Sequence, residues 1–173
     1  MKVLSNTGPI IGLAKIEKLS LLKELAEEVF IPPLAIIRNP VSWRNRVSMA
    51  SKCGWESSRI DLAINSFIKV TELSEISNEI KQVISTNDGG EKQVISLGSV
   101  TSGQLILLLD DKAGRNAAKK LGLATTGLVG VLIFAKEKGL INEVSSLLEE
   151  LRIQGYWLGD SLIRIAKNLA GET

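Results

Sequence analysis

The chain has 173 residues, of which 45% are hydrophobic and 23% charged, a balance typical of globular proteins. This length suits one domain with a sizeable core, so we expect a single domain over residues 1–173. Its helical C-terminal portion, from about residue 126, should pack on the same core. The formal net charge of +2 is too small to indicate a nucleic-acid-binding protein by itself.

Missing residue types narrow the chemistry further. The sequence has no histidine, which excludes a histidine general base, a Ser-His-Asp relay and imidazole ligands for zinc. Cys53 is the only cysteine, so an internal disulfide is excluded and we expect a cytoplasmic protein. No apolar run approaches the roughly 18 residues of a membrane span, so we expect no membrane partner. Carboxylate, lysine and hydroxyl chemistry remains, together with cations such as Mg²⁺ or Mn²⁺ that prefer oxygen ligands.

The first half of the chain predicts short strands and helices in alternation. We predict a strand at 3–4, a turn at 5–9 and a helix at 10–16 that Asn6 or Thr7 could cap. A helix at 19–28 and a strand at 29–31 follow, and the strand ends at Pro32-Pro33. Residues 40–58 look less regular. A strand at 67–70, a helix at 74–84 and a turn at 87–90 lead to a helix that begins near Glu91.

The second half begins with the strongest strand signal. Residues 105–109 form a continuous apolar run of the kind that a parallel sheet buries on both faces. Helices are predicted at about 112–121, 128–138, 142–152 and 160–170. Alternating strands and helices predict an α/β fold, a three-layer α/β/α sandwich with a mostly parallel central sheet.

Polar side chains follow two of these strands and are candidates for a site. Asn6 follows the first strand, and Asp110 and Asp111 follow the strand at 105–109. Ligands bind beyond the carboxyl ends of parallel strands, so these residues could share one crevice with Glu91. Carboxylates gathered there would repel one another unless a divalent cation bound between them.

Each of these residues also has a structural interpretation. Asn6 and Asp111 are suitable helix N-caps, and Glu91 in a first helical turn is favoured by the helix dipole. Successive strand side chains point to opposite faces, so Asp110 and Asp111 should not both face one metal unless the chain turns sharply.

A basic ridge is predicted beside these acids. Lys112, Arg115 and Lys119 are spaced i, i+3 and i+7, which places them on one helix face. Such a ridge could hold a phosphodiester backbone, and the alternative is an ordinary solvated helix face.

Several collinear segments together resemble a prokaryotic branch of the PIN-domain superfamily. They are, in order, VLSNTGPIIGLAKIEKLSLLKEL, EVFIPP, GGEKQVISL, LILLLDDKAGRNAAKKLGL, TTGLVGVLIFAKEKGLI and GYWLGDSLIRIAKNLAGE. The resemblance covers nearly the whole chain apart from about residues 40–58. It implies a parallel α/β/α sandwich and Mg²⁺- or Mn²⁺-dependent cleavage of RNA by about four acidic residues. It also implies toxin–antitoxin pairing and homodimers, which are frequent among relatives.

Carried over by position, the acidic set of the family is thinned in this chain. The first acid falls on Asn6, which is frequent in this branch, and the second falls on Arg38 or Asn39. The third matches Glu91, while Gln93 replaces a further Glu of the relatives, and the last matches Asp110 with Asp111 beside it. Leu128 stands where relatives often have Thr.

The resemblance therefore implies a metal-dependent endoribonuclease, with the toxin of a toxin–antitoxin pair as one biological role. Glu91, Asp110 and Asp111 would hold Mg²⁺ or Mn²⁺, and Asn6 would orient a water ligand. Lys112, Arg115 and Lys119 would guide single-stranded RNA, and Arg38 could hold a phosphate. The alternative is a catalytically inactive PIN fold that binds RNA or protein.

Overall fold

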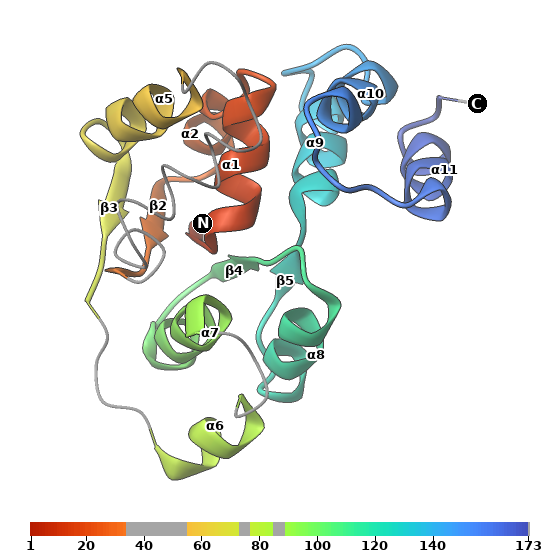
Figure 1. Cartoon of the computed structure of the whole chain (residues 1–173). Coiled ribbons are helices and arrows are strands. Elements are labelled where there is room, and N and C mark those ends of the chain that lie inside the picture. Colours follow the sequence, from red (N-terminus) through yellow and green to blue (C-terminus); the bar gives the residue numbers. More distant parts are fainter. Residues whose placement is uncertain (34–54, 73–76, 85–88, 173) are drawn as a thin grey trace.

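The central feature of the fold is one parallel sheet. The structure, a computed structural model, describes residues 1–33, 55–72, 77–84 and 89–172 (Figure 1). The strands pair in the order β3-β2-β1-β4-β5, and every pair is parallel. Their bounds are β1 Lys2–Ser5, β2 Glu28–Ile31, β3 Ile68–Val70, β4 Leu105–Leu108 and β5 Thr125–Thr126.

Helices connect the strands and cover the sheet (Figure 1). Within the described ranges they are α1 Thr7–Lys15, α2 Ser20–Leu25, α5 Trp55–Ile64, α6 Asn78–Val83, α7 Gly89–Val100, α8 Lys112–Lys120, α9 Leu128–Glu137, α10 Ser145–Ile153 and α11 Asp160–Leu169. None of these helices has the length and apolar character needed to cross a membrane.

Alternating strand side chains build two cores, one on each face of the sheet. Val3 and Leu108 face a cluster that includes buried residues of α1, α2, α5, α9, α10 and α11. Leu4 and Leu107 face the opposite cluster, which α7 and α8 complete. This is the period-2 pattern of strands buried on both sides. In Figure 1, α1, α5 and α9 lie on one side of the sheet and α7 and α8 on the other. The predicted three-layer α/β/α sandwich is confirmed.

Several elements differ from the sequence-based expectation. Helix α1 already begins at Thr7, inside the predicted turn at 5–9, and Glu28, predicted as the end of a helix, begins β2. Helix α5 begins at Trp55, so the prediction of irregular structure over 40–58 is wrong for its last four residues, and 40–54 lie outside the described residues. Strand β5 has only two residues, Thr125 and Thr126, too few for an apolar period to predict. It pairs with β4 through Leu107 and Leu108 and extends the sheet beyond β4.

Candidate active site

The candidate residues Asn6 and Asp110 follow two neighbouring strands of the sheet, β1 and β4. Ser5 of β1 pairs with Leu108 of β4, and the backbone N–H of Asn6 donates to the Leu108 carbonyl at 3.1 Å. Asn6 and Asp110 therefore leave adjacent strands at the same edge of the sheet. Strands β1 and β4 are thus neighbours, the condition under which the two residues can lie close together.

Asn6 is the N-cap of α1. Its side-chain Oδ1 accepts a hydrogen bond of 2.7 Å from the backbone N–H of Thr7. Capping satisfies a backbone donor that has no partner inside the helix. One of the two acceptor positions of this amide oxygen is therefore occupied at the start of α1.

Asp110 is held by two residues far away in sequence. Its Oδ1 accepts a hydrogen bond of 2.7 Å from the backbone N–H of Leu128, the first residue of α9. The N-cap of α9 is Gly127, which has no side chain to cap that helix, and Asp110 supplies the missing acceptor. Its Oδ2 accepts a hydrogen bond from the phenol of Tyr156.

The surroundings of Asp110 change its acidity. Burial raises the pKa of this carboxyl, and the hydrogen bonds from Tyr156 and Leu128 and the nearby Arg115 guanidinium only partly offset the rise. The acid therefore sits in a site that is partly closed to water, with both oxygens in contact with protein donors.

Asp111 has different hydrogen-bond partners from Asp110. It is the N-cap of α8, and its Oδ1 accepts hydrogen bonds from Ala113 at 2.6 Å and from Gly114 at 3.1 Å. Of the two interpretations, cap and metal ligand, the geometry therefore supports the cap.

Glu91 lies in the first turn of α7 and is only 5% exposed. Its carboxylate packs against Gly114 of α8, where an added Cβ would come within 3.0 Å of the Glu91 Cδ and 3.1 Å of its Oε1. Glycine at 114 thus lets α8 approach the carboxylate closely, and Glu91 lies between α7 and α8.

The three predicted basic residues of α8 divide into two kinds. The Arg115 guanidinium donates to the carbonyls of Leu109 at 2.9 Å and Asp110 at 2.6 Å, so it fixes the end of β4. Lys112 and Lys119 are exposed, as is Lys120 beside them. Arg38 lies outside the described residues.

The comparisons with known proteins decide the family. A sequence profile described as a PIN domain matches residues 2–172, almost the entire chain. The chain belongs to the PIN-domain family. Neither the curated proteins nor the solved structures gave a match. The PIN fold is a nuclease-type fold, and the resemblance drawn from the sequence motifs is confirmed.

PIN domains generally use divalent metal ions, which raises the question whether the side chains of this PIN domain could bind one. Across the described ranges, no three His, Cys, Asp or Glu side chains form a group that could hold a metal ion. Of the three predicted ligands, Asp110 and Asp111 accept hydrogen bonds from backbone N–H groups in the first turns of α9 and α8, and Glu91 packs between α7 and α8. Asn6, which was predicted to orient a water ligand, accepts from the first N–H of α1. The described residues therefore do not fit a three-carboxylate metal centre.

Sequence reasoning missed two partners of Asp110 in this PIN domain. Tyr156 lies within the GYW segment that carries the family resemblance, but nothing local connects it with a residue 46 positions earlier. The Leu128 donor is a backbone N–H, which any residue except proline would provide. One signal was present in the sequence. Gly127 precedes an apolar helix and has no side chain to cap it, so the first N–H groups of that helix need an acceptor from elsewhere in the chain.

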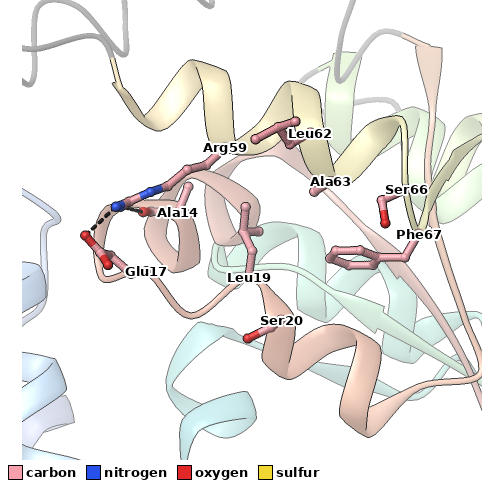
Figure 2. Close-up of a pocket in the computed structure, with 9 residues that line it drawn as sticks. All are labelled: Ala14, Glu17, Leu19, Ser20, Arg59, Leu62, Ala63, Ser66 and Phe67. Atoms are coloured by element: carbon pink, nitrogen blue, oxygen red, sulfur yellow. Dashed lines mark hydrogen bonds and ion pairs between the residues drawn. The ribbon is translucent and has the colours of Figure 1, made fainter.

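A hollow in the PIN domain lies away from this edge (Figure 2). It is lined by residues of α1, α2, α5 and their connections: Ala14, Glu17, Leu19, Ser20, Arg59, Leu62, Ala63, Ser66 and Phe67. Figure 2 shows Arg59 reaching Glu17, with which it forms an ion pair, and it also donates to the Ala14 carbonyl at 3.2 Å. Because Asn6 begins α1 and Glu17 follows its end, the hollow and the candidate active site lie at opposite ends of this helix.

Proposed function

We propose that this PIN-domain protein binds RNA along the carboxyl edge of its sheet and the exposed face of α8. The observation that carries the proposal is the use of Asn6, Asp110 and Asp111 as acceptors for helix N-termini. In this nuclease-type fold the acidic side chains accept hydrogen bonds from helix N-termini, and the surface that could bind nucleic acid is still present. It lacks, among the described residues, the acidic cluster that would hold a metal.

Exposed lysines at both ends of α8 support RNA as the partner. Lys112 begins α8, and Lys119 and Lys120 end it. All three are exposed, unlike Arg115, which is held by backbone carbonyls. Lysines neutralise phosphates without reading bases, so we expect binding with little sequence preference and a strong dependence on salt.

Fluorescence anisotropy with a labelled single-stranded RNA at several salt concentrations tests this proposal. Exchanging both Lys112 and Lys119 for Gln should weaken binding and reduce the slope of log affinity against log salt by about 1.4, at about 0.7 per lost phosphate contact. The matched control is Lys23→Gln, since Lys23 is an exposed lysine on α2. Binding that is absent from the wild type, or equally weakened by the control, would exclude this surface.

A second candidate function is metal-dependent cleavage of RNA. It is favoured by one observation, the partly buried Asp110 at the position where the sequence resemblance to the family places an acid. Mg²⁺ is often held by one or two carboxylates, with waters and substrate phosphates supplying the other ligands. If the protein is a ribonuclease, the proposal extends to toxin activity, an antitoxin partner and a homodimer.

One assay separates the two candidates. Purified protein and its Asp110→Asn variant are incubated with mixed RNA and Mn²⁺, and RNA binding is measured in parallel. Cleavage by the wild type that the variant loses supports the ribonuclease. Equal inertness of both proteins, with RNA binding retained, supports the binding module.

A further inference from the structure

Tyr156 is placed firmly beside Asp110 by the end of α10. Its backbone N–H donates to the Leu151 carbonyl at 2.8 Å, and the preceding Gly155 has a φ of +75°, a left-handed conformation that suits glycine. This turn directs the phenol toward the edge of the sheet, where it donates to Asp110 Oδ2.

The ring of Tyr156 packs closely on α1. A Cβ added at Gly12 would lie 2.9 Å from Cε2 of the ring, and one added at Gly8 would lie 3.9 Å from the phenol oxygen. Positions 8 and 12 lie one turn apart on one helix face. Glycine at position 12 therefore gives the ring its place against α1, whereas a Cβ at position 8 would make only an ordinary contact.

The other carboxylate oxygen is also covered. A Cβ added at Gly127 would come within 2.9 Å of Asp110 Oδ1, which also accepts from the Leu128 backbone. Asp110 thus has the start of α9 against one oxygen and Tyr156 against the other.

Mg²⁺ binds oxygen at about 2.0–2.1 Å and demands nearly octahedral geometry. A cation approaching Oδ2 from the side of the phenol would meet the Tyr156 hydroxyl and its proton.

We propose that Tyr156 competes with divalent cations for the carboxylate of Asp110. The phenol satisfies the carboxylate from within the protein, in the place where a bound cation would do so. The turn after α10 then decides whether the acid at the end of β4 can take a metal. This inference goes beyond RNA binding, and it stands or falls independently of that proposal.

Mn²⁺ affinity, measured by electron paramagnetic resonance of the free ion, tests the competition. We compare the wild type with Tyr156→Phe, Tyr156→Ala and the double variant Tyr156→Ala/Asp110→Asn. Removing a hydrogen bond to a charged group should tighten Mn²⁺ binding by about tenfold or more in Tyr156→Ala. The double variant should lose this gain. Trp157→Phe is the matched control, because Trp157 is the neighbouring aromatic residue and is 87% exposed.

The sign of the change in Mn²⁺ affinity distinguishes the possible roles of Tyr156. Unchanged affinity in both Tyr156 variants would overturn the competition. Weaker affinity would also overturn it and would mean that Tyr156 orients Asp110 toward a cation. RNA binding is recorded separately, so its loss or absence would exclude the proposed function without affecting this result.

A measurement on the wild type covers the case in which the variants do not fold. The chain has a single tyrosine, so its ultraviolet absorbance reports on Tyr156 alone among the tyrosine signals. Mg²⁺ binding that changes the tyrosine absorbance supports displacement of the phenol. Mg²⁺ binding at Asp110, absent from Asp110→Asn, that leaves the tyrosine absorbance unchanged would overturn the inference.

Discussion

Glu172 accepts a hydrogen bond of 2.7 Å from the backbone N–H of Ser145, although 27 residues separate the two. It also accepts from the Val144 backbone at 2.6 Å and from Lys136 Nζ at 2.6 Å. Val144, the N-cap of α10, has no polar side chain, so Glu172 supplies the acceptor that α10 lacks. The segment after α11 is thereby joined to the start of α10 and to α9.

Replacement of Glu172 by Gln should lower the free energy of unfolding by about 2 kcal/mol at neutral pH, since charged hydrogen bonds are lost. Desolvation acts to raise the pKa of Glu172, but the bonds from Lys136, Ser145 and Val144 outweigh it and lower the pKa to about 2. A lowered folded pKa means that the stabilisation is present above the ordinary value of 4.5 and is lost as the pH falls toward 2. Urea unfolding at a series of pH values should show wild type and variant converging across this window. Glu149→Gln is the control, an exposed glutamate on α10, and an equal pH effect there would contradict the assignment.

Gly127→Ala should destabilise the protein by about 1–3 kcal/mol, because the added methyl group would meet Asp110 Oδ1 at 2.9 Å and the Leu109 carbonyl at 3.5 Å. Gly159→Ala is a matched control. Both glycines are N-caps with negative φ, −116° and −71°, but the methyl group at 159 would have only an ordinary contact of 3.8 Å with Trp157. Thermal unfolding of the two variants compares them directly. Equal losses would mean that the cost lies in capping preference and not in the contact with Asp110.

Asp111→Ala should lower stability by about 1 kcal/mol through loss of the α8 cap, while Asp111→Asn, which keeps a capping oxygen, should lower it by much less. Chemical denaturation of both variants provides the measurement. If Asp111 were a metal ligand, its negative charge would matter more than its capping oxygen, and Asp111→Asn would lose as much stability as Asp111→Ala. A large loss in Asp111→Asn that appears only when Mn²⁺ is present would therefore favour the ligand.

Tyr156 should stay protonated well above the ordinary tyrosine pKa of 10.0. Burial raises the pKa of this phenol, and the negative charge of Asp110 and the hydrogen bond to it raise the pKa further. Asp110→Asn removes the charge, so the alkaline titration of tyrosinate absorbance should shift to lower pH in that variant. Circular dichroism at each pH confirms that the protein is still folded. An unchanged midpoint would show that Asp110 does not influence the phenol.

Local sequence signals predicted the parts of the site that local chemistry determines. Asn6 and Asp111 each stand just before a helix, and both cap it as their residue types and positions indicated. The apolar run before Asp110 predicted β4 correctly to within one residue. Because β4 ends at Leu108, strand alternation does not extend to Asp110 and Asp111, and their separate partners follow from the helix cap at Asp111.

The environment of Asp110 was not predictable in this way. Its partners Leu128 and Tyr156 come from 18 and 46 residues further along the chain. Tertiary packing brings these partners to Asp110, and no hydrophobic period encodes such a contact. The family resemblance supplied the position of the acid but not the protein donors that surround it.

The position of β1 in the sheet has a consequence for the order in which the chain folds. β1 pairs with β2, which follows closely in sequence, and with β4, whose residues come about a hundred positions later. During synthesis the β1–β2–β3 half can assemble first, while the other edge of β1 waits for β4 to emerge from the ribosome. Pairing across such a sequence separation closes a large loop, which slows folding. We therefore expect the candidate active site, built where β1 and β4 meet, to form only after β4 has been synthesised.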